Sequence, residues 1–321
     1  MSSWLTHGYR PPPKKIPQVN FGFRQLLPEG TIDPRKSGCT VISAFYTMRG
    51  KHSLETYKEF IRLFLEGCPC KMVFVTEEAL VPFIRECRRA YEDTTDVLII
   101  EKKAWTANKM QPFLWESLLA KDTEATYSSD YYKFLYEKRE FVRRVMAYNP
   151  FKHNDFMWVD PTICKDPRII PLIKMFPITN RIVTDKLMIM NQVPFEYSDE
   201  KAKMYNGFSL IGVKDRNRIN TCIIAGTKEK WIHYTDMYEA TVRKYQTANL
   251  FWGLDSIITA SIALENKSMI SLVEPKPTVD SYWKSMYGLL YFGAPPTIFK
   301  LMTDKATYEK KKSIDELISL K

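Results

Sequence analysis

Three short apolar segments separated by amphipathic stretches constrain the fold of this chain more than any other feature. The apolar segments are residues 40–46, 71–76 and 96–100, and helical periodicity appears between them at residues 53–65 and 77–91. Strand, helix, strand, helix, strand at this spacing is typical of a parallel sheet whose strands are joined by crossover helices. The sequence therefore predicts an α/β fold.

The later pattern is consistent with one continuous domain. A predicted helix over residues 130–148 leads into a strand at 156–159, and a further strand at 221–227 leads into a helix at 228–245. No internal repeat or convincing boundary divides the chain. We expect one domain over residues 39–300, preceded by a proline-rich extended arm (1–38) and followed by a basic helical tail (301–321).

Composition limits the kind of partner and the compartment. The net charge of +10 over 321 residues favours an anionic partner, such as nucleic acid, phospholipid or a nucleotide-linked substrate. No zinc-finger, RNP-like or P-loop pattern accompanies the basic residues, so we do not expect nucleic acid as the partner, and polyanion binding stays an alternative. No apolar stretch approaches the roughly 20 residues of a membrane span. The six cysteines form no CxxC pair, which favours reduced thiols and a cytoplasmic protein.

Asp160 is the leading candidate for a ligand-binding side chain. It follows the apolar run Phe156–Val159, and ligands of open α/β sheets bind outside the carboxyl ends of the strands. There a carboxylate could hold a divalent cation against a diphosphate. Pro161 and Thr162 offer a different interpretation, in which Asp160 caps a local turn. The sequence leaves both interpretations open.

Three other positions have both a functional and a structural interpretation. Lys138 lies on the apolar stripe of its predicted helix. It is either a functional cation or a side chain whose apolar stem packs on the core while its ammonium reaches water. Asp255 directly precedes a predicted apolar helix. It can be the N-cap of that helix, a residue of the functional site, or both. Gly226 ends a strand, where it permits a ligand to approach the backbone or only turns the chain.

Several of these pieces occur in the order found in one family. They are the strand at 40–46, Arg85–Arg88 with Thr95, Lys138, Asn149-Pro150-Phe151, residues 156–160, residues 225–227 and Gly253-Leu254-Asp255. The ordered set resembles the WlaTC/HtrL-type glycosyltransferases over about residues 40–275. The chain departs from that family at Asp160-Pro161-Thr162, where the family has Asp-x-Gly, and at Asp255-Ser256, where it has Asp-Gln.

The resemblance implies a GT-A-like single domain with a mainly parallel central sheet and helices on both faces. It implies transfer of a sugar from a nucleotide-sugar donor to a hydroxyl of a glycan acceptor, with Mn2+ or Mg2+ as the expected cofactor. The site residues that it implies are Asp160 for the metal, Asp255 for catalysis, Ala44, Phe45, Tyr46, Thr76, Arg88 and Lys138 for the donor, and Gly226 and Thr227 for the acceptor.

The second metal ligand has no candidate in the sequence. Trp158 stands where many nucleotide-sugar transferases have a further aspartate, and Asp155 lies five strand positions before Asp160, roughly 17 Å away. A member of the fold that has lost catalysis and scaffolds partners is therefore a further alternative.

Overall fold

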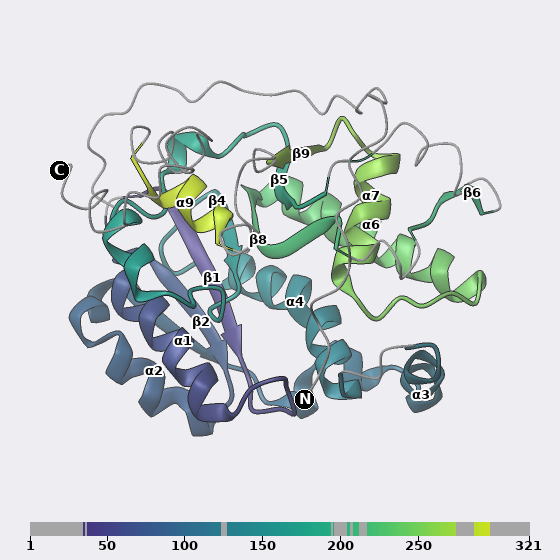
Figure 1. Ribbon diagram of the computed structural model, residues 1–321, viewed down its shortest axis with the longest axis horizontal. Helices are drawn as coiled ribbons and strands as arrows, with labels where there is room; N and C mark the ends of the chain where they lie inside the picture. Colours follow the sequence, from purple (N-terminus) through teal and green to yellow (C-terminus); the bar gives the residue numbers. More distant parts are fainter. Residues whose placement is uncertain are drawn as a thin grey trace, which may run out of the picture.

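The computed structural model describes residues 35, 37–122, 127–193, 195, 204–205, 208–211, 217–273 and 286–295. Within this part of the chain a seven-stranded sheet forms the centre of the molecule (Figure 1). The expected tail (301–321) and all of the expected arm except residues 35, 37 and 38 lie outside the described residues, so both stay predictions.

The sheet is mixed but mainly parallel. Its strand order is β3-β2-β1-β4-β8-β5-β9, and β8 alone runs antiparallel to its two neighbours. Two short strands, β6 (Met204–Tyr205) and β7 (Phe208–Ser209), pair separately. The strands of the main sheet are β1 (Cys39–Phe45), β2 (Met72–Thr76), β3 (Thr95–Ile99), β4 (Asp155–Val159), β5 (Leu187–Asn191), β8 (Ile219–Thr227) and β9 (Ile270–Val273).

Helices cover both faces of the sheet, because successive side chains of each strand point to opposite sides. Val41 packs into one buried cluster and Ile42 into the other. The first cluster includes side chains of α1 (Leu54–Gly67), α2 (Val81–Cys87) and α9 (Tyr287–Gly293). The second includes side chains of α3 (Pro112–Ala120), α4 (Ser129–Tyr148), α6 (Lys228–Thr247) and α7 (Asp255–Glu265). The predicted α/β class, with a mainly parallel sheet and helices on both faces, is confirmed.

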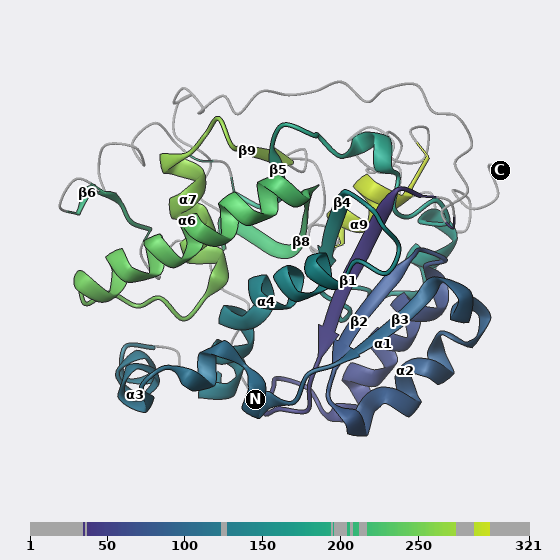
Figure 2. The same cartoon turned by 180° about the vertical axis from the view of Figure 1, so that it is seen from behind.

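The helices occupy two regions along the sheet. α1 and α2 lie beside β1 and β2, whereas α6 and α7 lie together beside β8 and β5 (Figure 1). Seen from behind, α3 lies on the side of α6, apart from α1 and α2 (Figure 2). The long helix α4 contacts both β1 and β4 and packs against α6, so it joins the two regions.

Local chemistry at the end of α4 sets the start of β4. Ser128 caps α4 by accepting a hydrogen bond from the Tyr131 N–H, and Asn149 ends it with a left-handed φ of 41°. The Asn149 side chain then donates to the His153 carbonyl (2.9 Å) and accepts from the His153 N–H (3.1 Å). This closed turn leads the chain into β4, and Asp160 directly follows that strand.

Candidate active site

A cavity of about 260 Å³ lies at the carboxyl ends of β1 and β4. This is the edge at which ligands bind in open α/β sheets. The cavity is lined by Ala44, Phe45, Tyr46, Met48, Gly50, Lys51, His52, Leu54, Tyr57, Phe60, Tyr127, Tyr131, Phe134, Asp160, Thr162 and Lys165. Seven of these sixteen residues are phenylalanine or tyrosine, and the lining also includes two lysines, a histidine and a single carboxylate.

Asp160 divides its two carboxylate oxygens between the two roles that the sequence left open. Its Oδ1 accepts hydrogen bonds from the Thr162 N–H (2.9 Å) and the Thr162 hydroxyl (2.7 Å), which is the local turn. Among the described residues, its Oδ2 meets only the Cys222 Sγ, at 3.9 Å. Burial and the nearby Asp160 charge raise the pKa of the Cys222 thiol to about 12, so the thiol stays protonated and can donate. One oxygen thus holds the turn while the other is left for a ligand.

Lys138 and Asp255 form a buried ion pair next to the cavity. The Lys138 Nζ lies 2.6 Å from the Asp255 Oδ2, donates to the Thr221 carbonyl at 2.9 Å, and lies 5.2 Å from the centre of the Trp158 ring. Asp255 is the first residue of α7 and Leu254 is the cap position, so the capping interpretation of Asp255 does not apply. Neither member of the pair lines the cavity.

Tyr131 connects the cavity with this buried pair. Its ring lines the cavity and stacks on Tyr127 with ring centres 4.3 Å apart. Burial is the largest cause that raises the pKa of the Tyr131 hydroxyl well above its usual range, followed by the Tyr127 hydroxyl and then by the carboxylates of Asp160 and Asp255. Both carboxylates are therefore near enough to Tyr131 to act on it electrostatically.

The donor residues expected after the first two strands lie at this edge of the sheet. Ala44, Phe45 and Tyr46 line the cavity, and the Tyr46 hydroxyl is fixed by donating to the Ile100 carbonyl at 2.9 Å. Thr76 lies beside Phe45 but does not line the cavity, because its hydroxyl donates to the Phe45 carbonyl at 2.8 Å. Thr76 therefore supports the wall of the cavity instead of facing into it.

Arg88, expected near the donor, lies at the opposite edge of the sheet. Its guanidinium donates to the carbonyls of Leu65, Cys68 and Cys70, which precede β2, and to the Thr95 hydroxyl at the start of β3. Burial lowers the pKa of this arginine. Its position corrects the expectation: Arg88 ties together the chain segments that enter the sheet and is not part of the candidate site.

Gly226 and Thr227, expected on the acceptor side, are also at the opposite edge. Because β8 is antiparallel to β4, Gly226 pairs with Phe156 and Thr227 with Asp155, at the start of β4. Thr227 caps α6, and a Cβ at Gly226 would come within 2.9 Å of Leu187. The sequence does not indicate the direction of β8. Because the strand runs antiparallel to β4, Gly226 and Thr227 lie beside the start of β4, and the earlier residues Thr221 and Cys222 lie near its end.

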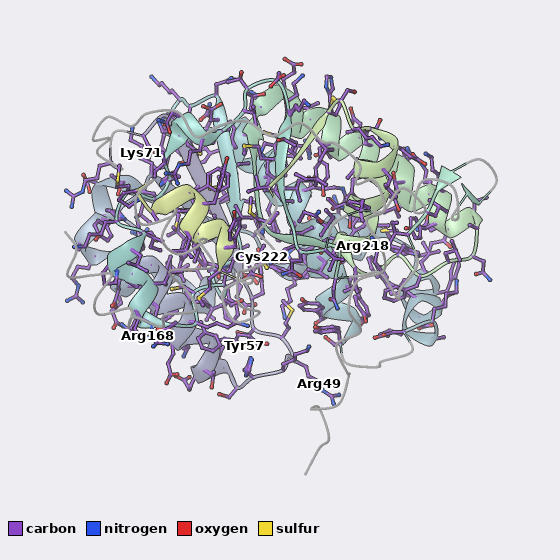
Figure 3. The ribbon with its side chains drawn as sticks, turned by 45° about the horizontal axis from the view of Figure 1, so that its top comes forward. Arg49, Tyr57, Lys71, Arg168, Arg218 and Cys222 are labelled. Carbon is purple, nitrogen blue, oxygen red and sulfur yellow. The ribbon has the colours of Figure 1, made fainter. Side chains whose placement is uncertain are left out.

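Side chains at the two edges are well separated. Lys71, which meets the His153 ring at 3.4 Å, lies near the top of the molecule in Figure 3, and Tyr57, which lines the cavity, lies near its lower edge. Asp155, at the start of β4, is thus remote from Asp160, as the sequence predicted.

The cavity fits a divalent cation only as a partial site. Among the described residues no group of three or more histidine, cysteine, aspartate or glutamate side chains could hold a metal ion, and Asp160 is the single carboxylate in the cavity lining. Mg2+ often binds proteins through one or two carboxylates and takes its other ligands from substrate phosphates and water. The residues present fit a cation that arrives with a phosphate ligand.

The basic residues of the cavity do not stand out in the sequence. Lys51 and His52 lie in the loop between β1 and α1, and Lys165 lies five residues after Asp160. The available signal was their position, because the loops after the first and fourth parallel strands meet at one edge of the sheet.

No protein-family model matches the sequence, and no curated protein sequence matches it either. The resemblance to the WlaTC/HtrL-type family is therefore not confirmed.

Solved structures of similar shape include several glycosyltransferases. Mouse xyloside xylosyltransferase 1 in its apo form is 11% identical, with 79% of this chain and 93% of that chain aligned and a TM-score of 0.42. Core-mannan synthase A from Aspergillus fumigatus in its Mn/GDP form is also 11% identical, with 80% and 81% aligned and a TM-score of 0.44. The PaToxG glycosyltransferase is 13% identical, with 88% and 86% aligned and a TM-score of 0.32.

In the described part of the chain, no helix combines the length and apolar character needed to cross a membrane. The six cysteines are all free thiols, as their spacing predicted.

Proposed function

We propose that the protein is a glycosyltransferase that moves a sugar from a nucleotide-sugar donor to a hydroxyl of a glycan acceptor. The observation that carries the proposal is the cavity at the carboxyl ends of β1 and β4, which aromatic side chains, two lysines and Asp160 line together. Aromatic rings offer stacking surfaces to a nucleobase or a sugar, and cations suit a diphosphate.

In the proposed reaction the bond between the sugar C1 and the diphosphate oxygen breaks, and its electron pair leaves with the diphosphate. A bond forms between C1 and the acceptor oxygen, whose proton passes to a base. A divalent cation bound at Asp160 would neutralise the charge of the departing diphosphate. The walls formed by Ala44, Phe45 and Tyr46 would hold the donor against this point.

Asp255 is the proposed base. A carboxylate can accept the proton of the acceptor hydroxyl, and the Lys138 ammonium at 2.6 Å fixes the position of the Asp255 carboxylate. Lys138 does not line the cavity, so we assign it to positioning Asp255 and not to contacting the donor. The electrostatic influence of Asp255 on Tyr131, which does line the cavity, supports a location close to the reacting groups.

Release of nucleoside diphosphate from a panel of nucleotide sugars, with Mn2+, with Mg2+ and with EDTA, tests the proposal. We expect release from one donor class, stimulated by the metal and reduced at least tenfold in Asp160→Asn. Asp155→Asn is a matched control, because Asp155 starts the strand that Asp160 follows and lies at the opposite edge of the sheet. Equal release by wild type and Asp160→Asn would argue against the proposed site.

A second candidate is nucleotide binding without turnover, as in a scaffold that has lost catalysis. The observation that favours it is the single carboxylate of the cavity, since the described residues offer no second metal ligand. Tight binding of nucleoside diphosphates together with no release from any donor of the panel would select this candidate. Affinity for DNA or RNA that falls steeply with salt and is unchanged in Asp160→Asn would instead indicate a polyanion-binding protein.

A further inference from the structure

The basic residues of the cavity have no individual role in the proposed reaction. Lys51, His52 and Lys165 line the cavity, and Lys51 and Lys165 are both exposed. Among the described residues, neither lysine has a carboxylate within ion-pair distance, although many other basic side chains of the molecule do. Exposed lysines without partners are common on surfaces, but here they converge on one hollow.

Both lysines are held close to aromatic walls of the cavity. The Lys51 Nζ lies 5.2 Å from the centre of the Tyr127 ring, and the Lys165 Nζ lies 6.0 Å from the centre of the Phe60 ring. A cation against the face of a ring is attracted by it, but its hydrogen-bond donors stay unsatisfied. These ammonium groups can therefore still donate to an anionic ligand.

The loop that carries Lys51 is anchored before any ligand arrives. The Lys51 N–H donates to the Tyr57 hydroxyl at 3.1 Å, and the Thr47 N–H donates to the Glu77 carboxylate at 2.8 Å. The Lys102 ammonium also donates to the Thr47 carbonyl. A fixed loop lowers the entropy that binding costs, so Lys51 is presented at the cavity in advance.

Lys165 follows the turn that begins at Asp160. Asp160 comes directly after β4, Thr162 closes the turn on its Oδ1, and Lys165 lines the cavity three residues further on. The segment after β4 thus offers the cavity a carboxylate oxygen and an ammonium, and the loop between β1 and α1 offers a second ammonium. A diphosphate carries enough negative charge for both ammonium groups and for a cation at Asp160.

We propose that Lys51 and Lys165 form a diphosphate subsite that holds the β-phosphate end of a nucleoside diphosphate even when no divalent cation is bound. The inference rests on the proposed function for the identity of the ligand. It adds that two side-chain cations supply the charge for which a second metal-binding carboxylate is missing. The nucleoside is held separately, by the aromatic part of the cavity.

Calorimetric titration of the full chain with uridine and guanosine diphosphates, and with the corresponding nucleosides, tests this subsite. We expect measurable diphosphate binding in EDTA and a loss of about 10- to 100-fold in Lys165→Gln and in Lys51→Gln, the size of one charge-assisted hydrogen bond. Affinity for the nucleoside is expected to stay unchanged. Lys165→Arg and Lys51→Arg keep the charge and are expected to retain most of the affinity.

Lys174→Gln is the matched control, because Lys174 is exposed, has no ion pair among the described residues and does not line the cavity. Unchanged diphosphate affinity in both glutamine variants, or an equal loss for nucleoside and diphosphate, would overturn the subsite and leave the proposed function standing. Diphosphate binding by wild type that needs Mn2+ absolutely would also overturn it. Wild type that binds no nucleotide in either buffer would overturn the proposed function as well.

Discussion

The two edges of the sheet use basic side chains in opposite ways. At the edge where the parallel strands begin, the buried guanidinium of Arg88 donates hydrogen bonds to three backbone carbonyls and to the Thr95 hydroxyl. At the edge where β1 and β4 end, Lys51 and Lys165 are exposed and have no acidic partner among the described residues. The difference separates charge that holds the fold together from charge that is available to a ligand.

The largest expected effect concerns the buried ion pair of Lys138 and Asp255, in which the lysine ammonium already has a carboxylate partner. We expect Lys138→Met to lower the free energy of unfolding by about 3–5 kcal/mol, because it leaves the Asp255 carboxylate buried without its partner. Urea denaturation measures the change. The double variant Lys138→Met/Asp255→Leu is expected to recover most of the loss, since no lone charge stays buried, and a loss below about 1 kcal/mol in the single variant would contradict the prediction.

Arg88→Met tests the other saturated cation. We expect a loss of roughly 1.5–3 kcal/mol in unfolding free energy, because buried carbonyls at the start of β2 lose their donor. Calorimetry of the same variant at a temperature where it is folded should show nucleoside diphosphate affinity equal to that of wild type. A change in affinity with no change in stability would reverse the distinction between the two edges.

Asp160→Asn probes the cavity edge with a side chain of the same size. We expect at least a tenfold loss of Mn2+-dependent diphosphate affinity, about 1.4 kcal/mol, because an amide cannot hold the cation as a carboxylate does. Stability should change little, since the asparagine Oδ1 can still accept from Thr162. Titration with and without Mn2+ measures the first effect and thermal unfolding the second; Asp155→Asn should leave the affinity unchanged.

The smallest expected effect is a pH dependence of the folding stability that comes from His153, at the edge opposite the cavity. One ring nitrogen of His153 is hydrogen-bonded to the Thr40 hydroxyl, and the other lies 3.4 Å from the Lys71 ammonium. Burial first, and then the positive charge of Lys71, lower the pKa of His153 below its usual value of 6.5. The unfolded chain therefore takes up a proton more readily than the folded one below about pH 6.5, and stability falls as the pH is lowered.

Thermal unfolding at pH 7 and at pH 5.5 measures this dependence in wild type and in His153→Gln. We expect the variant to lose less stability on acidification than wild type, because glutamine has no proton to gain. An identical loss in both proteins would show that His153 does not contribute to it.

The sequence predicted the fold well where the signal was local. The strand before Asp160 and the helix over residues 130–148 are both confirmed, because the apolar periodicity that predicts them lies within short stretches of adjacent residues. The direction of β8 was not predictable in this way, since antiparallel and parallel central strands have the same apolar composition. That single unknown moved Gly226 and Thr227 to the far edge of the sheet.

The site was predictable at its carboxylates and not at its cations. Asp160 stood out because it interrupts an apolar run, whereas Lys51 and Lys165 are ordinary lysines among 47 basic residues and acquire meaning only when two loops meet. The prediction for Arg88 is wrong for a related reason. A charged residue in a motif that resembles a family suggests a ligand contact, but the partners of Arg88 include backbone carbonyls of its own fold.

Two neighbouring residues of β8 tie together the two acidic side chains of the proposed reaction. The Asp160 N–H donates to the Cys222 carbonyl at 2.7 Å, and the Lys138 ammonium that grips Asp255 donates to the Thr221 carbonyl at 2.9 Å. Both carbonyls belong to one strand, whose extended backbone is paired on one side with β4 and on the other with β5. The position of Asp160 relative to the pair of Lys138 and Asp255 consequently depends on a single strand. A shift of β8 is expected to displace both together.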